Sequence, residues 1–413
     1  MTTQTNAARK TATEMTPKPK KRFAARIALI LLVSCVACGI ARAQDSWVFF
    51  GTHVGMAGRG FSVARFDSST GHLGLPQFLL EADAPGYFIL DSTGRHLYAT
   101  VSENTFDGQP TGAISAYSID PATAHLTLLD TVPSGSANPA YVSLDATGHT
   151  LFVANYNGAT VAAFAIKSDG SIGDRTANIT YTGHGADPVR QPQPHPHSIR
   201  VDPSNRFVLV PDLGLDQVHI YRFDASTGTL TPNDPTFAQM PPATGPRHMI
   251  FSTSGHFAYL LSEMANTVTV LSWDSAVGTL TVRQRVSTLP DGYAGPSTAA
   301  ELRLDPSGRF LYASNRGANT LAVFSVDADT GQLTQVEQVS TEGKSPRNFD
   351  FDPTGHWLIV ANHDSENVVV FAIDSATGKL TLHQPPVYVP YPFAVRFLTV
   401  ETLMSTPTAS AAH

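Results

Sequence analysis

Three short segments of the sequence carry paired basic or amide side chains. They read HPHSI, PRHMI and PRNFD, and they contain His195 and His197, Arg247 and His248, and Arg347 and Asn348. An arginine guanidinium binds a carboxylate or a phosphate through two parallel hydrogen bonds. A histidine can take a proton from water near neutral pH. The three segments therefore have the residue types of a site that binds an anion and activates a water molecule.

Further polar residues stand at the ends of apolar runs. Glu263 ends the run AYLLSE, and Asn315 and Arg316 end the run LYASNR. A carboxylate is another possible general base, and a further guanidinium can stabilise negative charge that develops in a transition state. Glu103 and Asp212 end similar runs, and we expect them to cap loops rather than to act as acids.

These segments belong to an internal repeat. The motif Asp-x-x-x-Gly-x-Leu occurs in five clear copies and one weaker copy, and a second motif of the type DPSGRFLY returns at steps of 47 to 57 residues. Each unit holds four short runs with the alternation and the β-branched or aromatic residues of strands. Four strands in about fifty residues describe one blade of a β-propeller.

Counting the units predicts an all-β, seven-bladed propeller of four-stranded antiparallel blades over residues 44–400. Only six blades have a first strand of their own unless the run FAVRFLTV, 393–400, is counted, so we expect this C-terminal strand to complete the N-terminal blade. Residues 401–413 are predicted to form a flexible tail.

The propeller arrangement explains why charged residues should stand at strand ends. First strands line the central channel, so side chains at their starts, and those at the ends of second strands, should meet in one funnel. The turns on the opposite face are uniform Asp…Gly hairpins. Because repeat proteins vary on the face that binds, we expect the chemistry at the face with varied loops.

The first 43 residues have the pattern of a secretory signal. Five basic residues between Lys18 and Arg26 precede the apolar run IALILLVSCVACGI, and small residues at Ala41 and Ala43 place the cleavage site after Ala43. We expect an exported protein, periplasmic or extracellular, with no membrane span after cleavage. A membrane anchor and a lipoprotein modified at Cys35 are the alternatives.

The part of the chain after Ala43 is acidic. It holds 19 basic and 33 acidic residues, a net charge of −14, and no cysteine. This balance argues against nucleic acid and anionic membranes as partners. A small anion stays possible, because a local group of arginines can dominate one pocket.

The chain resembles the seven-bladed lactonase family, the 6-phosphogluconolactonases of the propeller type. The similarity is densest in PHPHSIRVDP, GPRHMIF, STAAELRLDPSGRFLYASNRG and SPRNFDFDPTGHWLIVAN. It implies hydrolysis of a sugar lactone or phospholactone. A related propeller enzyme lactonises a carboxymuconate, and its active-site groups correspond by motif to His197, Glu263, Arg247 and Arg316. We expect these four to be catalytic.

Five further residues are predicted to bind a small anionic lactone or carboxylate: Arg347, His195, His248, Asn315 and Asn348. Either His197 or Glu263 is the expected base. We expect no cofactor and no metal, because no third ligand accompanies His195 and His197 at a recognisable spacing. We also expect a monomer. A non-catalytic binding propeller and a carboxymuconate-type cycloisomerase are the alternative functions.

Overall fold

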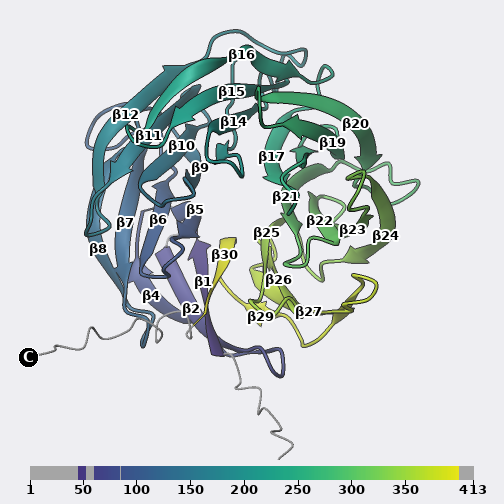
Figure 1. Ribbon diagram of the computed structural model, residues 1–413. Helices are drawn as coiled ribbons and strands as arrows, with labels where there is room; N and C mark the ends of the chain where they lie inside the picture. Colours follow the sequence, from purple (N-terminus) through teal and green to yellow (C-terminus); the bar gives the residue numbers. More distant parts are fainter. Residues whose placement is uncertain (1–44, 53–59, 84, 400–413) are drawn as a thin grey trace, which may run out of the picture. The chain divides into compact units, whose positions relative to one another are not determined.

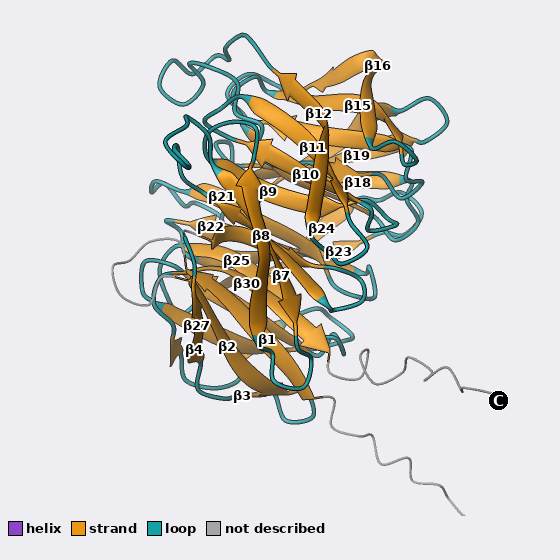
Figure 2. Ribbon diagram, turned by 90° about the vertical axis from the view of Figure 1, so that its left-hand side faces the viewer, coloured by secondary structure: helices purple, strands orange, loops and turns teal. Residues whose placement is uncertain are grey.

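The computed structural model describes residues 45–52, 60–83 and 85–399, and these residues form seven antiparallel sheets arranged in a ring (Figure 1). The predicted signal, residues 1–43, and the predicted tail, residues 401–413, lie outside the described residues. Figure 2 shows the sheets side-on, joined by loops. The prediction of an all-β, seven-bladed propeller is confirmed. Within the described residues no helix is long and apolar enough to cross a membrane.

The blades follow one another along the chain, with the first strand of each at the centre of the ring (Figure 1). Their strands are β30 (Pro392–Thr399), β1 (Asp45–Thr52), β2 (Gly60–Asp67), β3 (His72–Leu73) and β4 (Gln77–Glu81); β5 (Pro85–Leu90), β6 (His96–Val101), β7 (Ala113–Ile119) and β8 (Leu126–Pro133); β9 (Pro139–Leu144), β10 (Thr150–Asn155), β11 (Thr160–Ile166) and β12 (Ile172–Thr180); β13 (Arg200–Val201), β14 (Phe207–Asp212), β15 (Gln217–Asp224) and β16 (Thr229–Gln239); β17 (Pro246–Phe251), β18 (Phe257–Ser262), β19 (Thr267–Asp274) and β20 (Thr279–Ser287); β21 (Thr298–Leu304), β22 (Phe310–Arg316), β23 (Thr320–Val326) and β24 (Leu333–Ser340); and β25 (Pro346–Phe351), β26 (Trp357–Asn362), β27 (Asn367–Ile373), β28 (Leu380–Leu382) and β29 (Val387–Tyr388).

Burial explains the composition of the strands. Second strands lie between two neighbouring blades, so both of their faces are covered, and every residue of β10 and β14 is buried. They accordingly read as continuous apolar runs. Fourth strands face solvent, and every residue of β20 is exposed or half-buried.

The repeated Asp residues shape the turns between first and second strands. In the turn after β9, the Asp145 carboxylate accepts hydrogen bonds from the backbone N–H groups of His149 and Thr150. Gly148 in the same turn has a φ of 73°, which glycine adopts without strain. Asn205 takes the corresponding position in the blade that lacks this glycine, at a φ of 57°.

The ring closes as the sequence predicts. β30 pairs antiparallel with β1, and Val395 stands opposite Phe50. Val395 is buried in an apolar cluster that includes Phe50 from its own blade and Ile359 from the preceding one. The C-terminal strand thereby covers an edge that β1 would otherwise expose.

We expect Val395→Asp to lower the free energy of unfolding by at least about 3 kcal/mol, because it buries an unpaired carboxylate at the closure. Urea unfolding followed by circular dichroism measures the loss. The matched control is Val282→Asp on the outer strand β20, where the side chain is 47% exposed. Equal losses for the two variants would contradict a stabilising role for the closure.

Candidate active site

The cavity-facing residues of several inner strands lie at β-bulges. In β17, Pro246 pairs with Ser262 and His248 pairs with Leu261, which leaves Arg247 as an extra residue. The same register shift leaves Arg347 extra in β25 and Phe393 extra in β30. A bulge re-aims the extra side chain, and here all three line one cavity.

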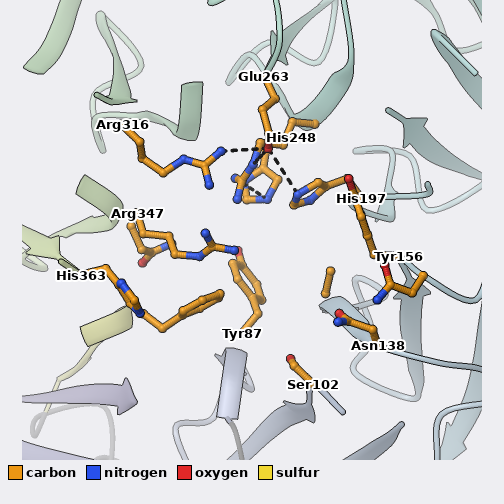
Figure 3. A pocket seen from close by; sticks show the side chains of 15 residues that line it. Tyr87, Ser102, Asn138, Tyr156, His197, His248, Glu263, Arg316, Arg347 and His363 are labelled. Atoms are coloured by element: carbon orange, nitrogen blue, oxygen red, sulfur yellow. Dashed lines mark hydrogen bonds and ion pairs between the residues drawn. The ribbon is translucent and has the colours of Figure 1, made fainter. Parts of the chain in front are cut away.

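The cavity lies at the starts of the inner strands and has a volume of about 450 Å³, which is within the usual range for small-molecule sites. Figure 3 shows side chains from many blades pointing into it. It is lined by Tyr87, Ser102, Asn138, Ala140, Tyr156, Asn157, His197, Arg247, His248, Glu263, Arg316, Arg347, Asn348, His363 and Phe393. The predicted convergence of residues from distant blades is therefore observed.

The Glu263 carboxylate is the centre of the charged cluster. Its Oε2 lies 2.9 Å from Arg247 Nε and 3.0 Å from Arg316 Nη2. Its Oε1 accepts a hydrogen bond of 2.6 Å from Arg190 Nη2. Burial alone would raise the pKa of Glu263, but Arg316, Arg247 and His197 outweigh burial and lower that pKa well below 4.5. Glu263 is thus a permanent anion that neutralises part of the arginine charge.

His197 lies beside this carboxylate. Its Nε2 is 3.7 Å from Glu263 Oε2, which is longer than a hydrogen bond. Burial, with Arg247 next in importance, lowers the pKa of His197 well below 6.5. The imidazole is therefore neutral at physiological pH and has a nitrogen that can accept a proton.

His248 forms part of the cavity wall and is fully hydrogen-bonded. Its Nδ1 is 3.0 Å from Glu301 Oε1, and its Nε2 is 3.0 Å from Arg247 Nη1. Burial and the charge of Arg247 lower the pKa of His248 to about 4. A neutral ring with its proton on Nδ1 donates to Glu301 and accepts from Arg247, so both nitrogens are satisfied.

Arg347 has a different environment from the other arginines of the cluster. No carboxylate of the described residues forms an ion pair with it, and its Nε is buried without a hydrogen-bond partner among them. Its guanidinium lies 3.8 Å from the centre of the Phe393 ring. Burial, Arg316 and Arg247 lower the pKa of Arg347, which means that its positive charge is poorly compensated. An anionic ligand group beside Arg347 would supply the missing charge.

The remaining predicted binding residues have other contacts. Asn315 donates to the Thr288 carbonyl, and Asn155 and Asn362 make the equivalent bonds to Ser134 and Thr341. This contact ties the second strand to the residue that follows the fourth strand of the preceding blade, and Asn315 is not among the described residues that line the cavity. This repeated structural hydrogen bond accounts for the asparagine at position 315, so Asn315 needs no ligand-binding role.

His195 and Asn348 support the wall. The His195 ring stacks on Tyr156 at 4.3 Å between centroids and is likewise not among the lining residues described. Asn348 lines the cavity, but its oxygen accepts from Arg396 Nη1 at 2.9 Å and its amide donates to Glu301. Both residues hold other side chains in place.

Sequence reasoning missed Arg190, Tyr156 and Phe393. Arg190 lies in the long connection between β12 and β13, which has no counterpart in the other units, so the repeat gave no signal for it. The sequence does contain a pattern that points to Phe393. Like Arg247 and Arg347, Phe393 directly follows the proline that opens an inner strand. No group of three or more His, Cys, Asp or Glu residues that could hold a metal occurs in residues 45–52, 60–83 and 85–399.

Comparison with known proteins connects this site to a family. A family model described as "Lactonase, 7-bladed beta-propeller" matches residues 47–397. A 6-phosphogluconolactonase from Bacillus subtilis (strain 168) is 34% identical over 351 residues, which cover 85% of this chain and 97% of that protein. A 6-phosphogluconolactonase from Formosa agariphila is 30% identical over 299 residues, covering 71% of this chain and 82% of that protein.

A solved structure, the periplasmic gluconolactonase of Pseudomonas aeruginosa, superposes with a TM-score of 0.80 at 33% identity. The match covers 86% of this chain and 99% of that chain. The family match and these similarities extend over nearly the whole propeller. The chain therefore belongs to the seven-bladed β-propeller lactonase family.

Proposed function

We propose that this protein hydrolyses a sugar lactone in the Glu263 cavity. The observation that carries the proposal is the convergence of Arg247, Arg316 and His197 on one buried carboxylate inside a small-molecule cavity. Relatives named 6-phosphogluconolactonase and gluconolactonase support a sugar lactone as the substrate class. The reaction adds water across the ring ester and yields a hydroxy acid.

His197 is the better candidate for the general base. Glu263 is held as an anion with a strongly lowered pKa, so it has little tendency to take a proton. His197 is neutral, and the 3.7 Å gap between its Nε2 and the carboxylate leaves that nitrogen free to accept a proton from water. The imidazolium formed in this step can return the proton to the ring oxygen when the ester bond breaks.

The arginines supply the electrostatic part of the mechanism. Attack of water on the lactone carbonyl places a negative charge on its oxygen, and guanidinium groups already fixed in position stabilise such a charge without reorganising. Arg247 and Arg316 are fixed by Glu263. Arg347 lacks such a partner among the described residues, so we assign it to an anionic group of the substrate, such as a 6-phosphate.

We expect His197→Gln to reduce kcat/KM for gluconolactone and 6-phosphogluconolactone by about 100-fold or more, because the base is lost. Proton release above the spontaneous background measures the rate. His125→Gln, at an exposed histidine, is the control and should match the wild type. Activity of His197→Gln equal to the wild type would remove His197 from the mechanism.

The pH dependence of kcat/KM tests the role of His197 in a second way. Only neutral His197 accepts a proton, and its pKa is lowered, so kcat/KM should stay flat from neutral pH to 6.5 and fall only at lower pH. Glu263 raises the pKa of His197, so Glu263→Gln should move the acid limb to still lower pH. If Glu263 were the base, this variant would instead abolish the limb.

Arg347 is expected to recognise the phosphate of a phosphorylated substrate. Arg347→Met should raise KM for 6-phosphogluconolactone by about tenfold or more and affect gluconolactone less, since a charged hydrogen bond is worth about 1.5–3 kcal/mol. Arg283→Met, at an exposed arginine of β20, is the matched control. An equal rise in KM for both lactones would contradict a phosphate-binding role.

We further propose that the protein is exported and loses its first 43 residues. The basic leader, the apolar run and Ala43 support this proposal, as does the description of the Pseudomonas aeruginosa relative as periplasmic. N-terminal sequencing of the protein from the extracytoplasmic fraction is expected to begin at Gln44. A protein found only in the cytoplasm with Met1 retained would overturn the proposal, and a lipid on Cys35 would indicate a lipoprotein.

A further inference from the structure

A second cavity lies at the other ends of the inner strands. Its volume is about 540 Å³, and it is lined by strand ends such as Leu90 and Leu144 and by the turn residues Ser92 and Ala146. Both turn residues are exposed, so the cavity opens on the face with the uniform Asp…Gly turns. Sequence analysis expected no chemistry on this face.

Three arginines from three different blades line this second cavity: Arg200 of β13, Arg303 of β21 and Arg396 of β30. Arg200 and Arg303 each stand two residues before the Asp that opens the following turn. Arg396 stands four residues after Pro392, as Arg200 does after Pro196. The three therefore occupy one level of the ring, and we call them the arginine layer.

Two carboxylates outside the cavity lining, Asp350 and Glu301, compensate part of the positive charge of the arginine layer. Asp350, 3.0 Å from Arg303 Nη1, is the one carboxylate of the described residues that forms an ion pair with any of the three. Arg200 donates to the Tyr141 hydroxyl at 2.8 Å, and Arg396 donates to the amide oxygen of Asn348. The lining of the cavity itself holds the three arginines and one carboxylate, Asp145, in a chain whose net charge is −7.

Each arginine of the layer also keeps an unused donor. Arg200 Nε, Arg303 Nε and Arg396 Nη2 are buried and have no hydrogen-bond partner among the described residues. Arg396 as a whole is only 7% exposed. Burying a charged donor without an acceptor costs free energy, and an oxygen-rich anion bound to the cavity-facing edges of these guanidinium groups would offset that cost through charge and hydrogen bonds.

A septum of side chains separates this cavity from the Glu263 cavity. Tyr87 and Tyr141 stack with 4.2 Å between ring centroids. Tyr141 and His248 make an edge-to-face contact with 5.1 Å between ring centroids. The His248–Glu301 contact continues the septum toward Asn348. Tyr87 lines both cavities, so the second cavity is a neighbour of the first and has its own set of arginines.

We propose that the arginine layer is a second binding site, which takes a small oxyanion such as a phosphate or the carboxylate of a sugar acid. Guanidinium groups bind either group bidentately. The proposal does not depend on lactone hydrolysis, because it rests on residues that the catalytic cavity does not use.

Equilibrium dialysis with radioactive inorganic phosphate tests the proposal. The wild type is expected to bind about two equivalents, one in each cavity. Arg347→Met should retain the site in the arginine layer, whereas Arg200→Gln should retain only the catalytic site and weaken binding to the layer at least tenfold. Arg222→Gln, at an exposed arginine of β15, is the control and should bind like the wild type.

A second variant distinguishes loss of the binding site from misfolding of Arg200→Gln. Ser92→Glu adds a carboxylate at the exposed rim of the second cavity without removing an internal contact, and it should also weaken phosphate binding to the layer. Competition with gluconate distinguishes the ligand: displacement shows that the site accepts carboxylates, and its absence restricts the site to phosphates. Phosphate binding to Arg200→Gln and Ser92→Glu that equals wild-type binding would overturn the proposal, whatever the lactonase activity.

Discussion

The contact between the Glu263 carboxylate and the surrounding guanidinium groups is the interaction on which the cavity depends. Arg190, Arg247 and Arg316 come from a loop and two blades, and all three touch this one side chain. Like charges at such distances repel, and burial strengthens the repulsion. A buried carboxylate offsets it, and removing one partner of such a buried group typically costs about 3–5 kcal/mol. Glu263 is therefore best understood as the group that lets a cationic site exist in a folded protein.

The inner strands place different chemistry at successive depths of the channel. Bulges at their starts turn Arg247, Arg347 and Phe393 into the Glu263 cavity. Further along, Tyr141 and His248 belong to the septum, and Arg200 and Arg396 lie beyond it. Alternate residues of a strand share a face, and the bulges near the strand starts shift this alternation by one residue, so successive positions along each inner strand build these levels. The inner strands thus place charged side chains at both of their ends.

Much of this arrangement could be predicted from the sequence, because it follows from the repeat. The regular return of Asp-centred turns gives the blade count, and the unpaired run at 393–400 gives the closure. The meeting of His197, Arg247, Glu263 and Arg316 also follows from ring geometry. The role of Asn315 could not be predicted in this way, since its hydrogen bond to the Thr288 carbonyl depends on where the preceding blade ends. Arg190 lies in a connection outside the repeat, and the arginine layer lies on a face whose turns all look alike.

The pairing of β30 with β1 also affects how a nascent chain acquires its structure. During synthesis β1 emerges first, but its inner partner begins only at Pro392. The first blade therefore keeps an open inner edge until the last blade has been translated, and contacts of such long sequence separation form slowly. A ribosome-bound or translocating chain must protect that edge from other strands throughout this interval.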